Sequence, residues 1–134
     1  MNSTIAQLQD AMNRHDADAV AALFAEDYRS EQPAHPNRGF GGPSQVAANW
    51  SGMFRGVPDL EVGVVKESTD GATSWSEWVW RGTRGAGEPF LMRGVIVMGL
   101  HEDGLIAWAR LYMEPVEQGG APIDEAVRQL SGAR

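Results

Sequence analysis

Residues 74–80, SWSEWVW, place Trp75, Trp78 and Trp80 within six positions, although the whole chain of 134 residues has only five tryptophans. Successive side chains of a β-strand point to opposite faces of the sheet. Trp75 and Glu77 therefore share one face, and Trp78 and Trp80 share the other. The fold depends on which of these two faces meets the core.

The polarity of the last predicted strand, residues 105–115, indicates the answer. Its positions 107, 109, 111 and 113 carry only Ala, Leu and Met. The alternate positions carry Trp108, Arg110, Tyr112 and Glu114. Burying unpaired Arg and Glu costs several kcal/mol, so the apolar set is predicted to face the helices. By size and polarity we place Trp78 and Trp80 on this inner face and Glu77 on the outer one.

Helix signals fill the first part of the chain. Thr4 and Gln7 fit a capping box, and Asp16 or Asp18 can cap a second helix. Pro43 follows two glycines and begins a third helix that ends at about residue 56. A further helix is expected after Pro122.

Most of the strand signals follow the third helix. A short strand lies between the second and third helices, and four longer ones form a meander. The predicted strands are residues 26–33, 58–68, 73–83, 89–100 and 105–115. Helices followed by a strand meander predict an α+β fold, with helices on one face of an antiparallel sheet. We expect one domain over residues 1–134.

Composition narrows the classes of partner. The formal net charge is -7, which argues against nucleic acid because phosphates need a basic surface. No run of residues approaches the roughly 18 apolar positions of a membrane span, so no membrane partner and a cytoplasmic location are expected. The chain has no cysteine and no HxH or HExxH spacing, so neither a metal nor another cofactor is predicted.

Two segments carry a family resemblance: HDADAVAALFAEDY, residues 15–28, and EDGLIAWARLYMEP, residues 102–115. With the order of elements between them, they resemble the NTF2-like superfamily, nearest to SnoaL-like and ketosteroid-isomerase-like proteins. The resemblance covers nearly the whole chain. It implies a cone, in which a curved sheet wraps around a long helix and encloses an apolar cavity. Many such proteins are dimers.

The catalytic residues that the resemblance implies are missing. In proteins resembling ketosteroid isomerase, the general base falls at Gln32, whose amide takes no proton at neutral pH. The oxyanion-stabilising acid falls near Ile96 and the tyrosine near Leu8. In proteins resembling limonene epoxide hydrolase, the Arg and two Asp residues fall at Trp78, Trp80 and Leu111.

The expected cavity is therefore apolar, with two polar contacts. Its predicted lining is Ser30, Gln32, Trp50, Phe54, Trp78, Trp80, Met92, Ile96, Met98, Leu111 and Met113. Two functions remain open. One is an isomerase, cyclase or hydrolase acting on a small apolar or aromatic molecule. The other is a non-catalytic dimeric module that binds a ligand or a partner. A cavity above roughly 300 Å³ with an inward ionisable group favours the first, and a packed cone favours the second.

Two catalytic candidates are Glu31, near the end of the first strand, and His35, in the loop after it. His35 stands between two prolines, where Glu31 or Arg38 could make it a general acid or base.

The outer face of the sheet combines tryptophans with opposite charges, which predicts a homodimer interface. Its predicted members are Trp75, Glu77, Arg93, Trp108, Arg110, Tyr112 and Glu114. We expect Arg93 or Arg110 to pair with Glu77. If the two faces were reversed, this set would instead form a polar active site.

Overall fold

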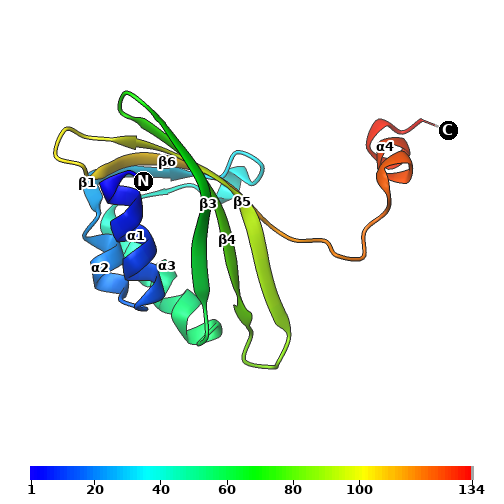
Figure 1. Ribbon diagram of the computed structural model, residues 1–134, viewed down its shortest axis with the longest axis horizontal. Helices are drawn as coiled ribbons and strands as arrows, with labels where there is room; N and C mark the ends of the chain where they lie inside the picture. Colours follow the sequence, from blue (N-terminus) through cyan, green and yellow to red (C-terminus); the bar gives the residue numbers. More distant parts are fainter. Residues whose placement is uncertain (134) are drawn as a thin grey trace.

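The computed structural model describes residues 1–133 as three packed helices, a six-stranded sheet and a separate C-terminal helix (Figure 1). The elements are α1 (Ser3–Asn13), α2 (Ala17–Ala21), β1 (Phe24–Glu31), η1 (Pro36–Arg38), β2 (Phe40–Gly41), α3 (Pro43–Gly56), β3 (Glu61–Asp70), β4 (Thr73–Thr83), β5 (Pro89–Leu100), β6 (Ile106–Pro115) and α4 (Ile123–Ser131). The predicted α+β class is confirmed.

The sheet has the strand order β2-β1-β6-β5-β4-β3. Strands β3 to β6 form the predicted antiparallel meander. Strand β1 departs from the prediction because it pairs with β6 in the parallel direction, with Ser30 opposite Ala109. Helix α3 and the four strands β2 to β5 separate β1 from β6 along the chain, so no short turn fixes their relative direction.

Helices α1, α2 and α3 lie against one face of the curved sheet (Figure 1). The apolar face of α1 is buried through Ile5, Leu8 and Met12. The cap of this helix differs from the prediction. Asn2 accepts hydrogen bonds from the backbone N–H groups of Thr4 and Ile5, while the Thr4 hydroxyl donates to the Gly104 carbonyl over 2.7 Å.

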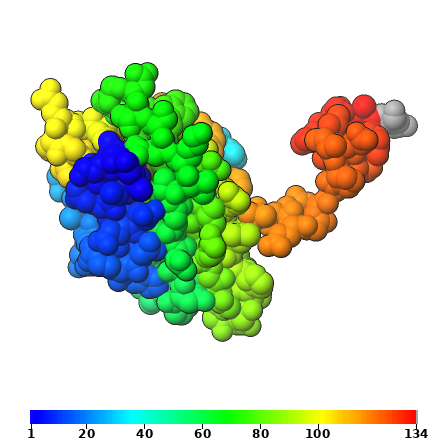
Figure 2. Space-filling view, viewed as in Figure 1, coloured from blue at the N-terminus to red at the C-terminus, as the bar shows by residue number. Residues whose placement is uncertain are grey.

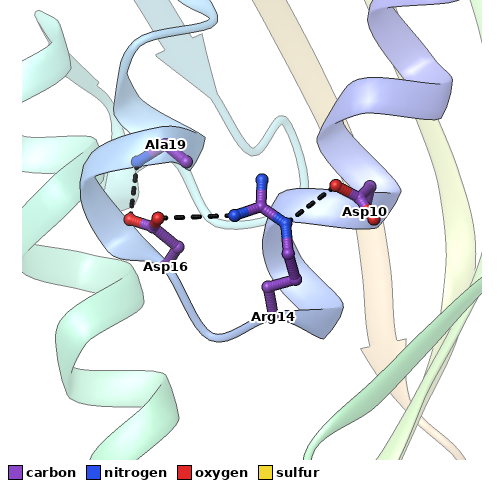
Figure 3. Close-up of polar contacts among 4 residues, drawn as sticks. All are labelled: Asp10, Arg14, Asp16 and Ala19. Atoms are coloured by element: carbon purple, nitrogen blue, oxygen red, sulfur yellow. Dashed lines mark hydrogen bonds and ion pairs between the residues drawn. The ribbon is translucent and has the colours of Figure 1, made fainter.

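The junction between α1 and α2 is held by charged groups (Figure 3). Arg14 Nε lies 2.8 Å from Asp10 Oδ2, and its Nη1 lies 3.5 Å from Asp16 Oδ2. The Asp10 side chain thereby raises the pKa of Arg14. Asp16 also accepts the Ala19 N–H over 2.9 Å, so it is the cap of α2. The second helix ends before Phe24, which begins β1 instead of extending the helix.

Strand β4 faces the way that polarity predicts. Trp78 is completely buried and Trp80 is 6% exposed, whereas the Glu77 side chain is about half exposed. The Trp78 Nε1–H donates to Ser76 Oγ over 2.8 Å, and the Ser76 hydroxyl donates to the Ile96 carbonyl over 3.3 Å. The indole is therefore buried with its one polar group paired.

The chain leaves the sheet after β6. Val116 still donates to the Leu91 carbonyl, and residues 117–122 then lead to α4. No residue of α4 is buried. The space-filling view shows the helix standing clear of the rest of the molecule (Figure 2).

The two buried serines of β4 provide a matched test of the Trp78 hydrogen bond. Ser76→Ala removes the acceptor of a buried N–H and should lower the free energy of unfolding by about 1–3 kcal/mol. Ser74 is equally buried, but its hydroxyl has no hydrogen-bond partner among the residues described. We therefore expect Ser74→Ala to be neutral or stabilising in urea denaturation. Equal losses in the two variants would contradict the role given to Ser76.

Candidate functional site

The cone holds a cavity of about 190 Å³ between the helices and the inner face of the sheet. Its walls are mostly apolar, and four of its side chains carry a hydroxyl or an amide. The lining residues are Leu8, Met12, Phe24, Tyr28, Ser30, Gln32, Phe40, Val46, Asn49, Trp50, Met53, Trp80, Ile96, Met98, Ala109 and Leu111.

The structure brings together seven of the residues predicted to line the cavity. These are Ser30, Gln32, Trp50, Trp80, Ile96, Met98 and Leu111. Four others lie outside the lining. Trp78 and Met113 are sealed into the core, and Met92 packs against its edge. The Phe54 ring stacks on His15, with ring centroids 4.6 Å apart.

Sequence reasoning missed Tyr28, although a signal for it was present. Residues 28, 30 and 32 have the same parity, so a strand that turns Ser30 inward also turns Tyr28 inward. The other missed side chains come mainly from α1 and α3. They are Leu8, Met12, Phe24, Phe40, Val46, Asn49, Met53 and Ala109. The positions of those from α1 and α3 depend on how the helices dock, which strand parity does not determine, whereas parity already turned Ala109 inward.

The Tyr28 phenol is a neutral hydrogen-bond donor. Burial raises its pKa to about 12, against a smaller lowering by the Ser30 side chain. At neutral pH the group therefore keeps its proton. It can donate to a ligand, but it cannot serve as a base.

The two amides of the cavity also present donors. Arg38 Nη1 donates to Gln32 Oε1 over 3.0 Å, and a guanidinium only donates. The Gln32 oxygen thus accepts one hydrogen bond, and the Nε2 amide group can donate to other partners. Gln45 Nε2 donates to Asn49 Oδ1 over 2.7 Å, which leaves the Asn49 Nδ2 group in the same way.

Trp80 adds its indole ring to this wall. Its Nε1 is buried and has no hydrogen-bond partner among the residues described. The Trp50 ring packs edge-on against the Trp80 ring, with ring centroids 5.2 Å apart. Among the polar side chains of the lining, Tyr28, Gln32 and Asn49 thus each offer a donor, and within the described chain none of the lining residues carries a carboxylate or an imidazole.

The two weak catalytic candidates lie outside the cavity lining. His35 Nε2 is 2.6 Å from Glu114 Oε1, so the expected pairing with Glu31 or Arg38 is replaced by one with β6. Glu31 Oε2 is 3.9 Å from Arg110 Nε. Both contacts are to the outer set of β6 side chains, because β1 and β6 are neighbours in the sheet.

The outer face is partly exposed. The side chains of Trp75 and Tyr112 are 51% and 45% exposed. Trp108 lies over Gly99, where any Cβ would clash with the indole, and the Arg110 guanidinium stacks 4.8 Å from its ring centroid.

The two arginine–glutamate pairs of this face are long. Arg93 Nη2 is 3.7 Å from Glu77 Oε2, as one predicted alternative had it, whereas Arg110 approaches Glu31 instead of Glu77. Such half-exposed pairs contribute under about 1 kcal/mol each.

A second histidine joins a turn to the sheet. His101 Nε2 lies 2.9 Å from Asp27 Oδ1. This contact raises the pKa of His101 and lowers the pKa of Asp27.

In the described part of the chain, no group of three or more His, Asp or Glu side chains is arranged to hold a metal ion. No helix described there is long and apolar enough to span a bilayer.

Comparisons with known proteins agree with this architecture. The family described as the SnoaL-like domain matches residues 5–109. No protein of known annotation matches the chain by sequence.

Three similar solved structures share the fold, at 18–21% sequence identity. A Catenulispora acidiphila protein with a ketosteroid isomerase-like fold, in complex with trimethylamine, has a TM-score of 0.71 at 18% identity, covering 91% of this chain and 95% of that one. A Mycobacterium tuberculosis protein in complex with estradiol-17beta-hemisuccinate has a TM-score of 0.69 at 21% identity, covering 81% and 89%. An epoxide hydrolase of the LEH-like type from the same organism has a TM-score of 0.71 at 20% identity, covering 84% and 81%.

The His101–Asp27 pair predicts a pH dependence of stability. The raised pKa of His101 means that its contribution is present below the ordinary value of 6.5 and is lost as pH rises through the raised value. The lowered pKa of Asp27 means that its contribution is present above 3.8 and is lost as pH falls through the lowered value. We expect His101→Gln to reduce the denaturation midpoint most at about pH 5, where both groups are charged.

The control for this prediction is the same substitution in an Asp27→Asn background. There the effect of His101→Gln should be small at every pH, because the partner charge is already absent. An effect of His101→Gln that is the same in both backgrounds would show that the ion pair contributes nothing.

Proposed function

The chain belongs to the SnoaL-like family, and from this premise we propose that it binds a small, uncharged aromatic or alicyclic molecule in its cone. The observation that supports this proposal most directly is the lining of the cavity. It combines apolar walls with the donor groups of Tyr28, Gln32 and Asn49. A cytoplasmic location stays a prediction.

The size of the cavity sets the size of the ligand. An apolar protein cavity of about 150 Å³ binds benzene, and this one measures about 190 Å³. Sites for drug-sized molecules begin at roughly 300 Å³. The cavity therefore suits one ring with a short substituent.

The polar atoms of the lining set the chemistry of that substituent. Because Tyr28, Gln32 and Asn49 each offer a donor, they favour a ligand that accepts hydrogen bonds, such as a ketone, an ester or an ether. No cationic side chain is among the described lining residues, so a buried carboxylate would lose its hydration without a compensating charge. We therefore favour a neutral carbonyl compound.

Binding without turnover fits the groups in the cavity better than acid–base catalysis does. General acid–base catalysis needs a group within hydrogen-bond reach of the ligand whose pKa is near the working pH. Tyr28 is the ionisable side chain of the described lining, and its pKa is about 12.

We also propose that two copies of the chain associate through the outer sheet face. A half-exposed tryptophan and tyrosine, together with arginines, are the residue types enriched at protein interfaces. Because Glu77 and Arg93 lie side by side on this face, a two-fold arrangement can bring the acid of one copy to the base of the other.

Ligand binding is tested with acetophenone and ethylbenzene, which have similar shapes but differ in the carbonyl group. We expect acetophenone to bind more tightly and to quench the fluorescence of Trp50 and Trp80. Tyr28→Phe should weaken acetophenone binding about 2- to 12-fold, which corresponds to one net hydrogen bond of about 0.5–1.5 kcal/mol. Ethylbenzene binding should stay unchanged.

The chain contains a matched control in its second tyrosine. Tyr112→Phe alters the outer face and should leave the binding of both compounds unchanged. Ala109→Leu fills the cavity and should abolish both. Ligand recovered unchanged after long incubation supports binding alone. A converted ligand, or equal affinity for the two compounds, would contradict the proposal as stated.

Association is tested by sedimentation equilibrium. We expect the wild-type chain to form dimers, and Trp75→Ser to weaken the dimer at least tenfold because it removes the largest exposed side chain of the outer face. Arg84→Ser, in the turn between β4 and β5, should change the dissociation constant less than twofold. A wild-type chain that stays monomeric at high concentration rules out this second proposal and leaves ligand binding untouched.

A further inference from the structure

We propose that α4 is an exchanged arm whose apolar stripe docks on the outer sheet face of a second copy of this chain. The inference rests on the dimer proposed above and adds a second contact to it. It assigns a partner to the part of the structure that is least covered by the rest of its own chain.

The first observation is the surface of α4 itself. Ile123, Val127 and Leu130 are 75%, 51% and 88% exposed. With Ala126 they follow the i, i+3, i+4, i+7 spacing of a single apolar stripe. The opposite side carries Asp124, Glu125 and Arg128, and the last two pair over 2.7 Å.

A helix this short needs a partner. Isolated helices below about 12–15 residues are marginal in water, and most helical stability comes from packing an apolar face. Helix α4 has nine residues, and none of them is buried. The stripe is therefore expected to gain its stability from a surface outside the described contacts of α4.

The second observation is the path of the chain. Residues 116–122 connect the end of β6 to α4, and seven residues span at most about 25 Å. The tether begins beside β5 through the Val116–Leu91 hydrogen bond. It carries α4 to the side of the sheet opposite α1, α2 and α3 (Figures 1 and 2). The arm thus leads away from the helical layer and toward whatever packs on the outer face.

The third observation is a second uncovered surface on the same chain. Trp75, Val65 and Tyr112 are 51%, 54% and 45% exposed, and Trp75 and Tyr112 are members of the outer face. A chain with two complementary apolar surfaces can bury both in a two-fold dimer, because each copy supplies one arm and one face.

Interface area favours a contact in trans. A nine-residue helix is only about 14 Å long, whereas a stable interface buries about 1,200–2,000 Å². In a two-fold dimer, the two docked arms and the two sheet faces together form one continuous interface. An arm folded back on its own face would instead cover the surface that the second copy needs.

The first test uses neighbouring residues of α4. Leu130→Asp puts a charge on the stripe, and Gln129→Asp puts the same charge beside it. Both substitutions lie in the last turn, so their effect on helix stability should be similar. In sedimentation equilibrium we expect Leu130→Asp to raise the dimer dissociation constant at least tenfold and Gln129→Asp to change it less than twofold. Equal effects would overturn the proposal.

The second test distinguishes a partner from the chain's own face. Trypsin can cut after Arg128 in α4 and after Arg84 in the exposed β4–β5 turn, so the ratio of the two rates corrects for enzyme activity. Docking in trans predicts that relative cleavage at Arg128 falls as protein concentration rises through the dimer dissociation constant. Slow cleavage at every concentration would indicate docking in cis, and fast cleavage at every concentration would indicate an undocked arm. Either result overturns the proposal.

Failure of the arm can be told apart from failure of the dimer. If Trp75→Ser breaks the dimer while Leu130→Asp does not, the sheet interface stands and the arm contributes nothing to it. If the wild-type chain is monomeric at every concentration, both proposals fail together. Neither result affects the measurements of ligand binding in the cone.

Discussion

The hydrogen bond from the Trp78 indole to the Ser76 hydroxyl is the constraint on which the rest of the structure depends. A completely buried tryptophan costs about 1–3 kcal/mol when its N–H has no acceptor, and buried indoles usually find one. Ser76 supplies this acceptor from the same face of the same strand, and its own hydroxyl donates a hydrogen bond to the Ile96 carbonyl of β5. Since a one-residue slip would turn every side chain of β4 over, this arrangement fixes the direction of all its neighbours.

The cavity follows from this orientation together with the position of β1. With the indoles directed inward, the sheet offers an apolar wall, and the cavity beside it measures about 190 Å³. The polar groups come from elsewhere. Strand β1 lies next to β6 and brings Tyr28, Ser30 and Gln32 to that wall, while α3 brings Asn49. Donors therefore gather in the cone, and carboxylates do not.

The same orientation places the charged side chains outside. Glu77, Arg93, Arg110 and Glu114 look like an active site when read along the strands, yet they form separate, half-exposed pairs on the outer face. His35 joins them because its loop follows β1, which is the parallel neighbour of β6. The face that carries them also carries exposed aromatic rings, a combination suited to contact with another chain.

The sequence by itself determined the order of the elements, the bounds of β4, the inner position of Trp78 and the family of the chain. These features arise from local signals: a period of two in strands, helix caps, and the cost of burying charge. Tertiary structure alone decided the parallel pairing of β1 with β6, the exclusion of Trp78 and Met113 from the cavity wall, and the exposure of α4. Each of these depends on contacts between residues distant in the chain, whose geometry no local pattern records.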